Sequence, residues 1–171
     1  MDIRITEATE NDIALIKDMA EIVFKKTYEP ILTVNQIEYM MELMYSEKNL
    51  VKQFKEGHRF FIAYIKERAC GYVSVQKEKI SGCDTEFYHL HKLYVMPDVH
   101  GNGVGKLLFD KACTYAKNNS DNRKVRIELN VNRKNPSIDF YKKMGMYVAR
   151  EGDFPIGNGY LMNDYIMSID I

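Results

Sequence analysis

The sequence has no excess of charge of either sign, and this absence excludes several partners. Its 24 basic and 24 acidic residues cancel to a net charge of zero, so long-range attraction to nucleic acid or to an anionic membrane is not expected. No window approaches the roughly 18 consecutive apolar residues that a transmembrane helix needs. We therefore expect a protein that binds neither nucleic acid nor membrane, and any site for an anion must be built locally.

Cysteine is scarce as well, and the first residues carry no targeting pattern. Cys70, Cys83 and Cys113 are odd in number, widely spaced and not arranged as CxxC, which argues against a disulfide framework or a zinc site. The opening MDIRITEATE has no basic stretch followed by an apolar one, so no signal peptide is expected. Together these absences predict a cytoplasmic protein without a metal centre.

The length and the apolar pattern predict one α/β domain over residues 1–171. A chain of this length with 46% apolar residues is long enough for one core and short for two. Apolar spacing predicts, in chain order, strand 2–8, helices 13–28 and 35–46, strands 59–66, 67–78 and 85–96, helix 104–118, strand 124–131, helix 135–146, and strands 147–154 and 160–170. This mixed order favours a single mixed, mostly antiparallel sheet flanked by helices, and it differs from a doubly wound fold.

Three glycines at alternate positions precede the helix 104–118, in the stretch HGNGVGK from His100 to Lys106. A dinucleotide-binding fingerprint would need its third glycine where Lys106 stands, and a P-loop would need a serine or threonine where Leu107 stands. Both nucleotide interpretations therefore fail. Successive small residues at a helix N-terminus still expose backbone N–H groups that can hold a diphosphate without magnesium. The stretch predicts an anion cradle, and a glycine-rich turn without a ligand is the alternative.

Two blocks of the sequence resemble the GNAT N-acetyltransferase superfamily. LHKLYVMPDVHGNGVGKLLFDKA, residues 90–112, is similar to the family's strand, proline and (Gln/Arg)-x-x-Gly-x-(Gly/Ala) turn, with His100 in place of the usual Gln or Arg. LNVNRKNPSIDFYKKMGM, residues 129–146, resembles the second block, an Asn-rich loop that opens a helix carrying a tyrosine, with Ser137 where alanine is commonest. The resemblance implies the acyl-CoA N-acyltransferase fold and transfer of an acetyl group from acetyl-CoA to an amine.

The resemblance also implies a set of cofactor-binding positions. The diphosphate of coenzyme A would lie on the main-chain amides of Gly101, Asn102, Gly103, Val104, Gly105 and Lys106. Main-chain groups around Leu93, Tyr94 and Val95 would pair with the pantetheine arm, and Asn132 and Asn135 would line the same channel. His100 falls within the cradle without an assigned role, and ordinary loop and helix-cap chemistry is an equal alternative for the two asparagines.

Acetyl transfer to an amine needs a neutral nucleophile, a stabilised oxyanion and a protonated leaving thiolate. Tyr141 lies at the family's general-acid position, with a core tyrosine as the alternative. His89 and His91 share one face of their strand by alternation, and the resemblance places His89 where related enzymes carry a catalytic glutamate. Because histidine titrates near neutrality, either is a candidate base, directly or through water. Glu86 and Glu128 are reserve candidates.

The acceptor is the least specified part of the site. In the family the first two helices and the closing hairpin hold it, here around Tyr28, Glu29, Tyr39 and the segment 152–165. Aromatic residues beside acids suit a cationic amine, and the pattern FKKTYEP…NQIEYM…MYS is similar to bacterial polyamine acetyltransferases, although surface aromatics are an equal alternative. We expect a small amine such as a polyamine, or a peptide amine, and a homodimer. A non-catalytic acyl-CoA sensor or interaction module is the alternative function.

Overall fold

The computed structural model describes residues 1–121 and 124–171, and in this part of the chain seven strands form one sheet in the order β1-β2-β3-β4-β5-β7-β6. The strands are β1 (Ile3–Glu7), β2 (Arg59–Ile65), β3 (Arg68–Lys77), β4 (Thr85–Val95), β5 (Lys124–Asn132), β6 (Tyr147–Gly157) and β7 (Tyr160–Asp170). The helices are α1 (Ile13–Tyr28), α2 (Val34–Tyr45), α3 (Glu47–Lys55), α4 (Val104–Asn118) and α5 (Ser137–Lys143), with short 3-10 turns η1 (Glu10–Asp12) and η2 (Pro97–Val99). Since β4 and β5 are parallel and the other neighbouring strands are antiparallel, the predicted mixed sheet is confirmed.

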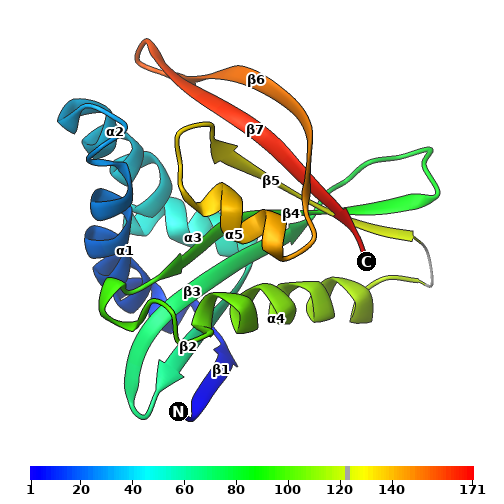
Figure 1. The fold of residues 1–171 in the computed structure, drawn as a ribbon, viewed down its shortest axis with the longest axis horizontal. Coiled ribbons are helices and arrows are strands. Elements are labelled where there is room, and N and C mark those ends of the chain that lie inside the picture. The colour runs from blue at the N-terminus through cyan, green and yellow to red at the C-terminus, as the bar shows by residue number, and fades with distance from the viewer. Residues whose placement is uncertain (122–123) are drawn as a thin grey trace.

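The helices cover both faces of the sheet, as Figure 1 shows. α1, α2 and α3 lie on one face and enclose an apolar core around Phe24 and Phe60. α4 and α5 lie on the other face, over a core around Leu108 and Ile127. The helices of the described residues are too short or too polar to cross a lipid bilayer. Because each face of the sheet is packed against its own apolar core, the strands that could border a site are held in place.

The helix α3 was not predicted from the sequence, which showed no element between residues 46 and 59. Ser46 ends α2 and also caps α3, because its side-chain oxygen accepts a hydrogen bond from the Asn49 amide at 3.3 Å. Leu50 is the one fully buried residue of this helix. Leu50, Val51 and Phe54 do pack on one side of this helix, but with only nine residues, most of them polar, it is shorter than the window over which apolar spacing is read.

The strands β4 and β5 separate along their length, and this separation divides the sheet. Their pairing runs from Thr85 opposite Lys124 to His89 opposite Glu128 and then stops. Beyond that point β4 continues to pair with β3 as far as Val95, while β5 continues to pair with β7. Two half-sheets diverge as a result, and the facing edges of β4 and β5 open into a gap between them.

A β-bulge on β4 lies where the divergence begins. Leu90 opposes Val75 and Lys92 opposes Ser74, so His91 is the extra residue. The bulge shifts which residues face each core. Leu90 packs into the core under α4, whereas Lys92, two residues later, reaches the aromatic rings of the core under α1 to α3. The bulge therefore directs polar side chains of the later half of β4 toward the α1 face.

Candidate active site

The glycine stretch forms a tight turn that leads directly into α4. Gly101 and Gly103 have φ angles of 83° and 82°, a left-handed conformation that glycine adopts without strain. Gly103 is the N-cap of α4, and it makes no side-chain cap hydrogen bond there. A Cβ added at either glycine would meet no described atom within 4 Å. Open N–H groups at the positive end of a helix, with free space above them, fit a diphosphate.

Polar contacts hold this turn in place before any ligand binds. Arg68 donates two hydrogen bonds to the Asp98 carboxylate, at 2.6 and 2.9 Å. The Asn102 side chain donates to the Val99 carbonyl oxygen at 3.2 Å. The Lys106 ammonium pairs with Asp110 one turn further along α4. Of the predicted cradle, the side chains of Asn102 and Lys106 are thus engaged within the protein, and the main-chain amides carry the site.

His100, whose role the sequence left open, connects the turn to β4. Its Nε2 donates a hydrogen bond to the Val95 carbonyl oxygen at 2.8 Å. The Tyr94 carbonyl faces β3, since its oxygen would lie 2.8 Å from a Cβ on Gly71. By strand alternation the main-chain groups of Leu93 and Val95 therefore face the gap. The Val95 carbonyl already accepts one bond from His100, which leaves the other groups of this edge for a ligand.

A cavity of about 420 Å³ lies between α1, the end of β4 and the loop that joins β5 to α5. Three predicted cofactor positions, Val95, His100 and Asn135, line it. Lys26 and Lys134 line it as well and add positive charge. The cavity thus joins the glycine turn to the gap between the half-sheets, as a channel for an extended anionic ligand requires.

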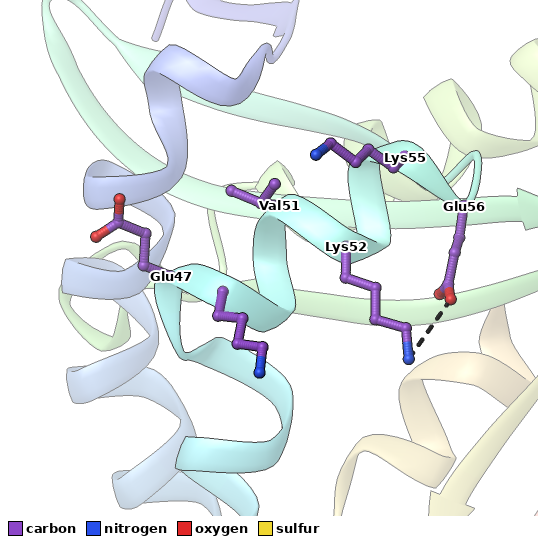
Figure 2. Close-up of a pocket in the computed structure, with 6 residues that line it drawn as sticks. Glu47, Val51, Lys52, Lys55 and Glu56 are labelled. Atoms are coloured by element: carbon purple, nitrogen blue, oxygen red, sulfur yellow. Dashed lines mark ion pairs between the residues drawn. The ribbon is translucent and has the colours of Figure 1, made fainter.

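A larger concavity of about 750 Å³ lies on the outer side of α3, away from the gap (Figure 2). Its lining is a helix surface of Glu47, Lys48, Val51, Lys52, Lys55 and Glu56. Lys52 and Glu56 form an ion pair of 3.7 Å across it. It contains none of the residues that the sequence singled out, so size alone does not locate the site.

Three tyrosines from different elements gather beside the gap. Tyr28 ends α1 and Tyr94 lies on β4, and their hydroxyl oxygens are 3.5 Å apart. Tyr141, on α5, is 7% exposed, and its hydroxyl has no hydrogen-bond partner among the described residues. Burial and the neighbouring Tyr28 raise the pKa of Tyr141 well above its usual value. Tyr141 is therefore a neutral proton donor with a free hydroxyl.

The two asparagines perform the loop and cap roles that the sequence left as an alternative. The Asn132 side-chain oxygen accepts a hydrogen bond from the Lys134 amide at 2.9 Å. The Asn135 side-chain oxygen accepts one from the Ser137 amide at the start of α5, also at 2.9 Å. Asn135 also acts on Tyr28, where it slightly lowers the pKa of the hydroxyl against the larger effect of burial. Both residues shape the channel wall, and Asn135 links α5 to the tyrosines.

Asp164 on β7 is a candidate site residue that the sequence did not single out. It is 2% exposed, and its Oδ2 accepts a hydrogen bond of 3.3 Å from the Asn130 side chain. Its Oδ1 is buried and has no partner among the described residues. Burial raises the pKa of this carboxyl, against smaller opposing effects from Asn130 and Arg133. The sequence signal that could have identified Asp164 is its position two residues before Ile166, which places the acid on the same, buried face of the strand.

The candidate bases His89 and His91 belong to a row of imidazoles on the α3 side of β4. The His91 ring lies 4.3 Å from His58 and 4.5 Å from His89, centroid to centroid. His89 lies 3.2 Å from Glu78, and His91 hydrogen-bonds to Gln76 at 2.9 Å. Desolvation and neighbouring positive charge lower the pKa of His91, and lower that of His58 to about 4.

The histidines and Tyr141 form two separate groups. No contact among the described residues joins either candidate base to Tyr141. The histidines lie at the start of the gap, where β4 and β5 are still paired through His89. Tyr141 lies with Tyr28 and Tyr94. A substrate that spans the gap would therefore meet Tyr141 and the two histidines at different points along its length.

The two reserve carboxylates are held in ion pairs. Glu128 accepts two hydrogen bonds from Arg150, both at 3.0 Å, and one from Ser168 at 2.6 Å. Burial alone would raise its pKa, but these bonds outweigh burial and the pKa of Glu128 is lowered. Glu86 pairs with Lys77 at 3.2 Å. An ionised, fully bonded carboxylate such as Glu128 is a poor proton acceptor.

Two predicted acceptor-binding residues have other surroundings than Tyr28. The Tyr39 hydroxyl donates to the Ile156 carbonyl oxygen at 2.8 Å, and its ring lies 5.3 Å from that of Tyr160. Tyr39 thus ties α2 to the β6–β7 hairpin. Glu29 is exposed just after α1. Tyr28 therefore lies beside the gap, next to Tyr94 of β4. Tyr39 instead contacts the β6–β7 hairpin.

Comparison with known proteins relates these features to a family. A family model described as the acetyltransferase (GNAT) family matches residues 19–146. The chain is 33% identical over 99 residues to the uncharacterised N-acetyltransferase MJ1207 of Methanocaldococcus jannaschii, which covers 57% of this chain and 42% of that protein. It is 39% identical over 62 residues to the peptidyl-lysine N-acetyltransferase YjaB of Salmonella typhimurium, covering 36% and 37%. The chain thus spans less than half the length of these two curated relatives.

A solved structure shares the whole fold. The PaiA N-acetyltransferase of Thermoplasma acidophilum, crystallised in complex with coenzyme A, superposes with a TM-score of 0.77 and 22% identity. The match covers 100% of each chain. At this identity the similarity establishes the shared fold and no shared chemistry.

Proposed function

Because the chain belongs to the acetyltransferase (GNAT) family, we propose that it is an N-acetyltransferase that moves an acetyl group from acetyl-CoA to a primary amine. The observation that carries the proposal is the gap between β4 and β5, which opens beside the uncapped glycine turn of α4. A thioester arm laid along that gap has an anion cradle at one end and Tyr141 beside it. Few other ligands need an anion site, an extended edge and a proton donor together.

The residues that would hold the cofactor fit it. The amides from Gly101 to Lys106 would bind the diphosphate, and the open space over Gly101 and Gly103 leaves room for it. Main-chain groups of Leu93 and Val95 would hydrogen-bond to the pantetheine arm, as an added strand does. Bound there, the cofactor supplies an activated acyl carbon.

Side chains of the protein would donate and accept the two protons that the transfer requires. Tyr141 is buried, neutral and free of other partners, so its hydroxyl can give a proton to a departing thiolate within hydrogen-bond reach. His91 and His58 are neutral near pH 7 because their pKa values are lowered. We keep His89 and His91 as the candidate bases, directly or through a water, although the lowered pKa of His91 makes that imidazole a weaker proton acceptor.

The acceptor we propose is a small amine such as a polyamine or an amine on a peptide. Similarity to a relative named as a peptidyl-lysine N-acetyltransferase supports a lysine amine, and the aromatic residues Tyr28, Tyr39 and Tyr94 suit a cation. We further propose that the enzyme acts in the cytoplasm. A homodimer is part of the same proposal, since β6 offers a free edge to the sheet.

The test is release of free thiol from acetyl-CoA across a panel of polyamines and peptides with free N-termini or lysines. The proposal predicts release with at least one amine, above the rate of hydrolysis without amine. If coenzyme A binds tightly but no amine provokes release, the chain is a non-catalytic acyl-CoA sensor or interaction module instead.

A further inference from the structure

The face of the sheet that carries α1 holds polar side chains on β5, which borders the gap, and on β7, its other neighbour. On β5 the apolar Leu129 and Val131 pack into the core under α4 and α5, so Asn130 between them points to the α1 face. On β7 Tyr165 and Met167 pack into that same core, so Asp164 points to the α1 face as well. Asp164 therefore faces the same side as α1.

The opposite wall of the gap brings aromatic groups toward Asp164. Met162, two residues before Asp164 on β7, packs against the same core as Tyr28 and Tyr94, so Asp164 shares their side of the sheet, and its charge contributes to the raised pKa of Tyr28. Tyr28 is in turn 3.5 Å from Tyr94, hydroxyl to hydroxyl. The buried carboxylate on β7 and the two tyrosines, one on α1 and one on β4, therefore lie on the same face of the sheet.

The hydrogen bonding of Asp164 is incomplete. Asn130 donates to Oδ2 at 3.3 Å, but the buried Oδ1 has no partner in the described part of the chain. Arg133, the nearby cation that stabilises its charge, donates to Asp153 at 2.6 Å instead. A buried acid oxygen without a donor is costly in a folded protein unless a ligand completes it.

We propose that Asp164 is the anchor of the acceptor, and that the acceptor is a primary alkylammonium whose N–H groups bond to the free Oδ1 between the half-sheets. The inference rests on the proposed function and specifies its acceptor. A primary ammonium has three donors and a positive charge, so it satisfies Oδ1 and offsets the buried negative charge together. The faces of Tyr28 and Tyr94 favour the same cation.

The chemistry excludes other classes of ligand. A carboxylate or phosphate would be repelled by Asp164, and a neutral amide would leave its charge uncompensated. A small polyamine and a lysine side chain present the same group, so the experiment includes one arm for each. Asp164 would hold the amine in its protonated form, and a different group would accept the proton before the amine attacks.

The variant Asp164→Asn keeps the shape of the side chain and removes its charge. Steady-state kinetics with spermidine and with a lysine-containing peptide should show the KM for the preferred amine rising roughly 10-fold or more. The KM for acetyl-CoA should change less than about 2-fold, because the cofactor contacts lie on β4 and α4. The matched control is Asp170→Asn, which alters an exposed acid at the end of the same strand, paired with Arg126, and should leave both constants unchanged.

The outcomes separate this inference from the proposed function. If no amine releases thiol with the unaltered protein, the proposed function fails. If the unaltered protein is active and Asp164→Asn has the same KM for the amine, the anchor is elsewhere and this inference is overturned. The arm with the lower KM, spermidine or peptide, identifies the source of the ammonium.

A binding measurement covers the case in which Asp164→Asn does not fold. Putrescine should raise the melting temperature of the coenzyme A-saturated protein, whereas butanediol, of the same length without charge, should not. The smaller variant Asp164→Ser should lose the putrescine shift. Equal shifts for the two ligands, or an undiminished shift in Asp164→Ser, would overturn the inference.

Discussion

At the scale of single residues, buried polar groups with incomplete hydrogen bonding among the described residues include one on α5 and one on β7. Tyr141 has a free hydroxyl, and Asp164 has a free carboxylate oxygen. By contrast, the Tyr45 and Tyr72 hydroxyls bond to each other at 2.7 Å, and Glu128 is fully bonded. Groups completed within the protein stabilise the fold, and the incomplete ones are where a substrate has bonds to make.

Replacing Tyr141 with phenylalanine tests the assignment of the acid. Because the hydroxyl has no partner to lose, stability and coenzyme A affinity should stay the same while kcat falls roughly 10²-fold. The matched control is Tyr88→Phe. That buried tyrosine donates to the Asn119 carbonyl at 3.1 Å, so its loss should lower stability without lowering kcat. An unchanged kcat in Tyr141→Phe would assign the proton to another group.

Lys92 should make stability depend on pH above neutrality. It is 4% exposed, donates to Gln53 at 2.7 Å, and burial lowers its pKa to about 7. In the unfolded chain a lysine binds its proton up to a pKa of about 10.4. Between these values the unfolded state binds more protons, so stability should rise with pH from about 7 toward 10.

The variant Lys92→Met removes this titration. Urea unfolding at pH 7 should show the variant more stable by about 1–3 kcal/mol, and the difference should shrink as the pH approaches 10. The same slope of stability against pH in both proteins would contradict a buried Lys92. Lys92→Met also loses the hydrogen bond to Gln53, and this loss reduces the increase in the free energy of unfolding.

At the scale of elements, the proposed cofactor site consists of two main-chain features, namely the edge of β4 and the N-terminus of α4. Pairing with β5 ends at His89, so the rest of β4 offers peptide groups to a ligand. Gly103 opens α4 without a side-chain cap, so its first amides are free. Both features depend on backbone geometry more than on side-chain identity, which explains how His100 can replace the family's Gln or Arg.

Gly103→Ala tests the turn. Forcing alanine into a left-handed conformation should cost about 1–2 kcal/mol of stability, and the added Cβ would intrude into the open space over the turn and weaken coenzyme A binding. The matched control is Gly82→Ala. Gly82 has a φ of 77° and an open surrounding away from the site, so calorimetry should show the strain without a loss of affinity. Equal affinities in the two variants would remove the glycine turn from the cofactor site.

The sequence predicted the elements that repeat a pattern and missed those that do not. The helix predicted over 104–118 matches α4, because its apolar residues recur at helical spacing. α3 was missed because it is short and mostly polar. The β4 bulge and the Asp164 environment depend on contacts between distant segments, which no local spacing encodes. Spacing predicted the anion cradle, but only the fold shows that His100 bonds to Val95.

At the scale of the whole molecule, the two half-sheets are joined on the far side of the gap by α2 and the β6–β7 hairpin. Gln36 donates to the Leu161 carbonyl at 2.9 Å, and Tyr39 donates to Ile156 at 2.8 Å. Gly157 lies so close to Tyr39 that a Cβ there would clash with the Tyr39 hydroxyl. The hairpin is thus held against α2.

Tyr39→Phe should loosen that contact. Loss of one hydrogen bond should speed amide hydrogen exchange in residues 155–161 by roughly 2- to 10-fold, with little change around α4. The matched control is Tyr160→Phe, which removes a hydroxyl from the same hairpin that has no partner among the described residues. If both variants exchange alike, the Tyr39 bond does not hold the hairpin.

The most direct test of the whole account follows the acetyl group itself. Isotope-labelled acetyl-CoA is mixed with the protein and the preferred amine of the panel, and mass spectrometry locates the label. The account predicts that the label appears on the amine nitrogen, in proportion to the thiol released, and that Tyr141→Phe slows its appearance. Label found only as free acetate, or remaining on coenzyme A with every amine, would contradict it.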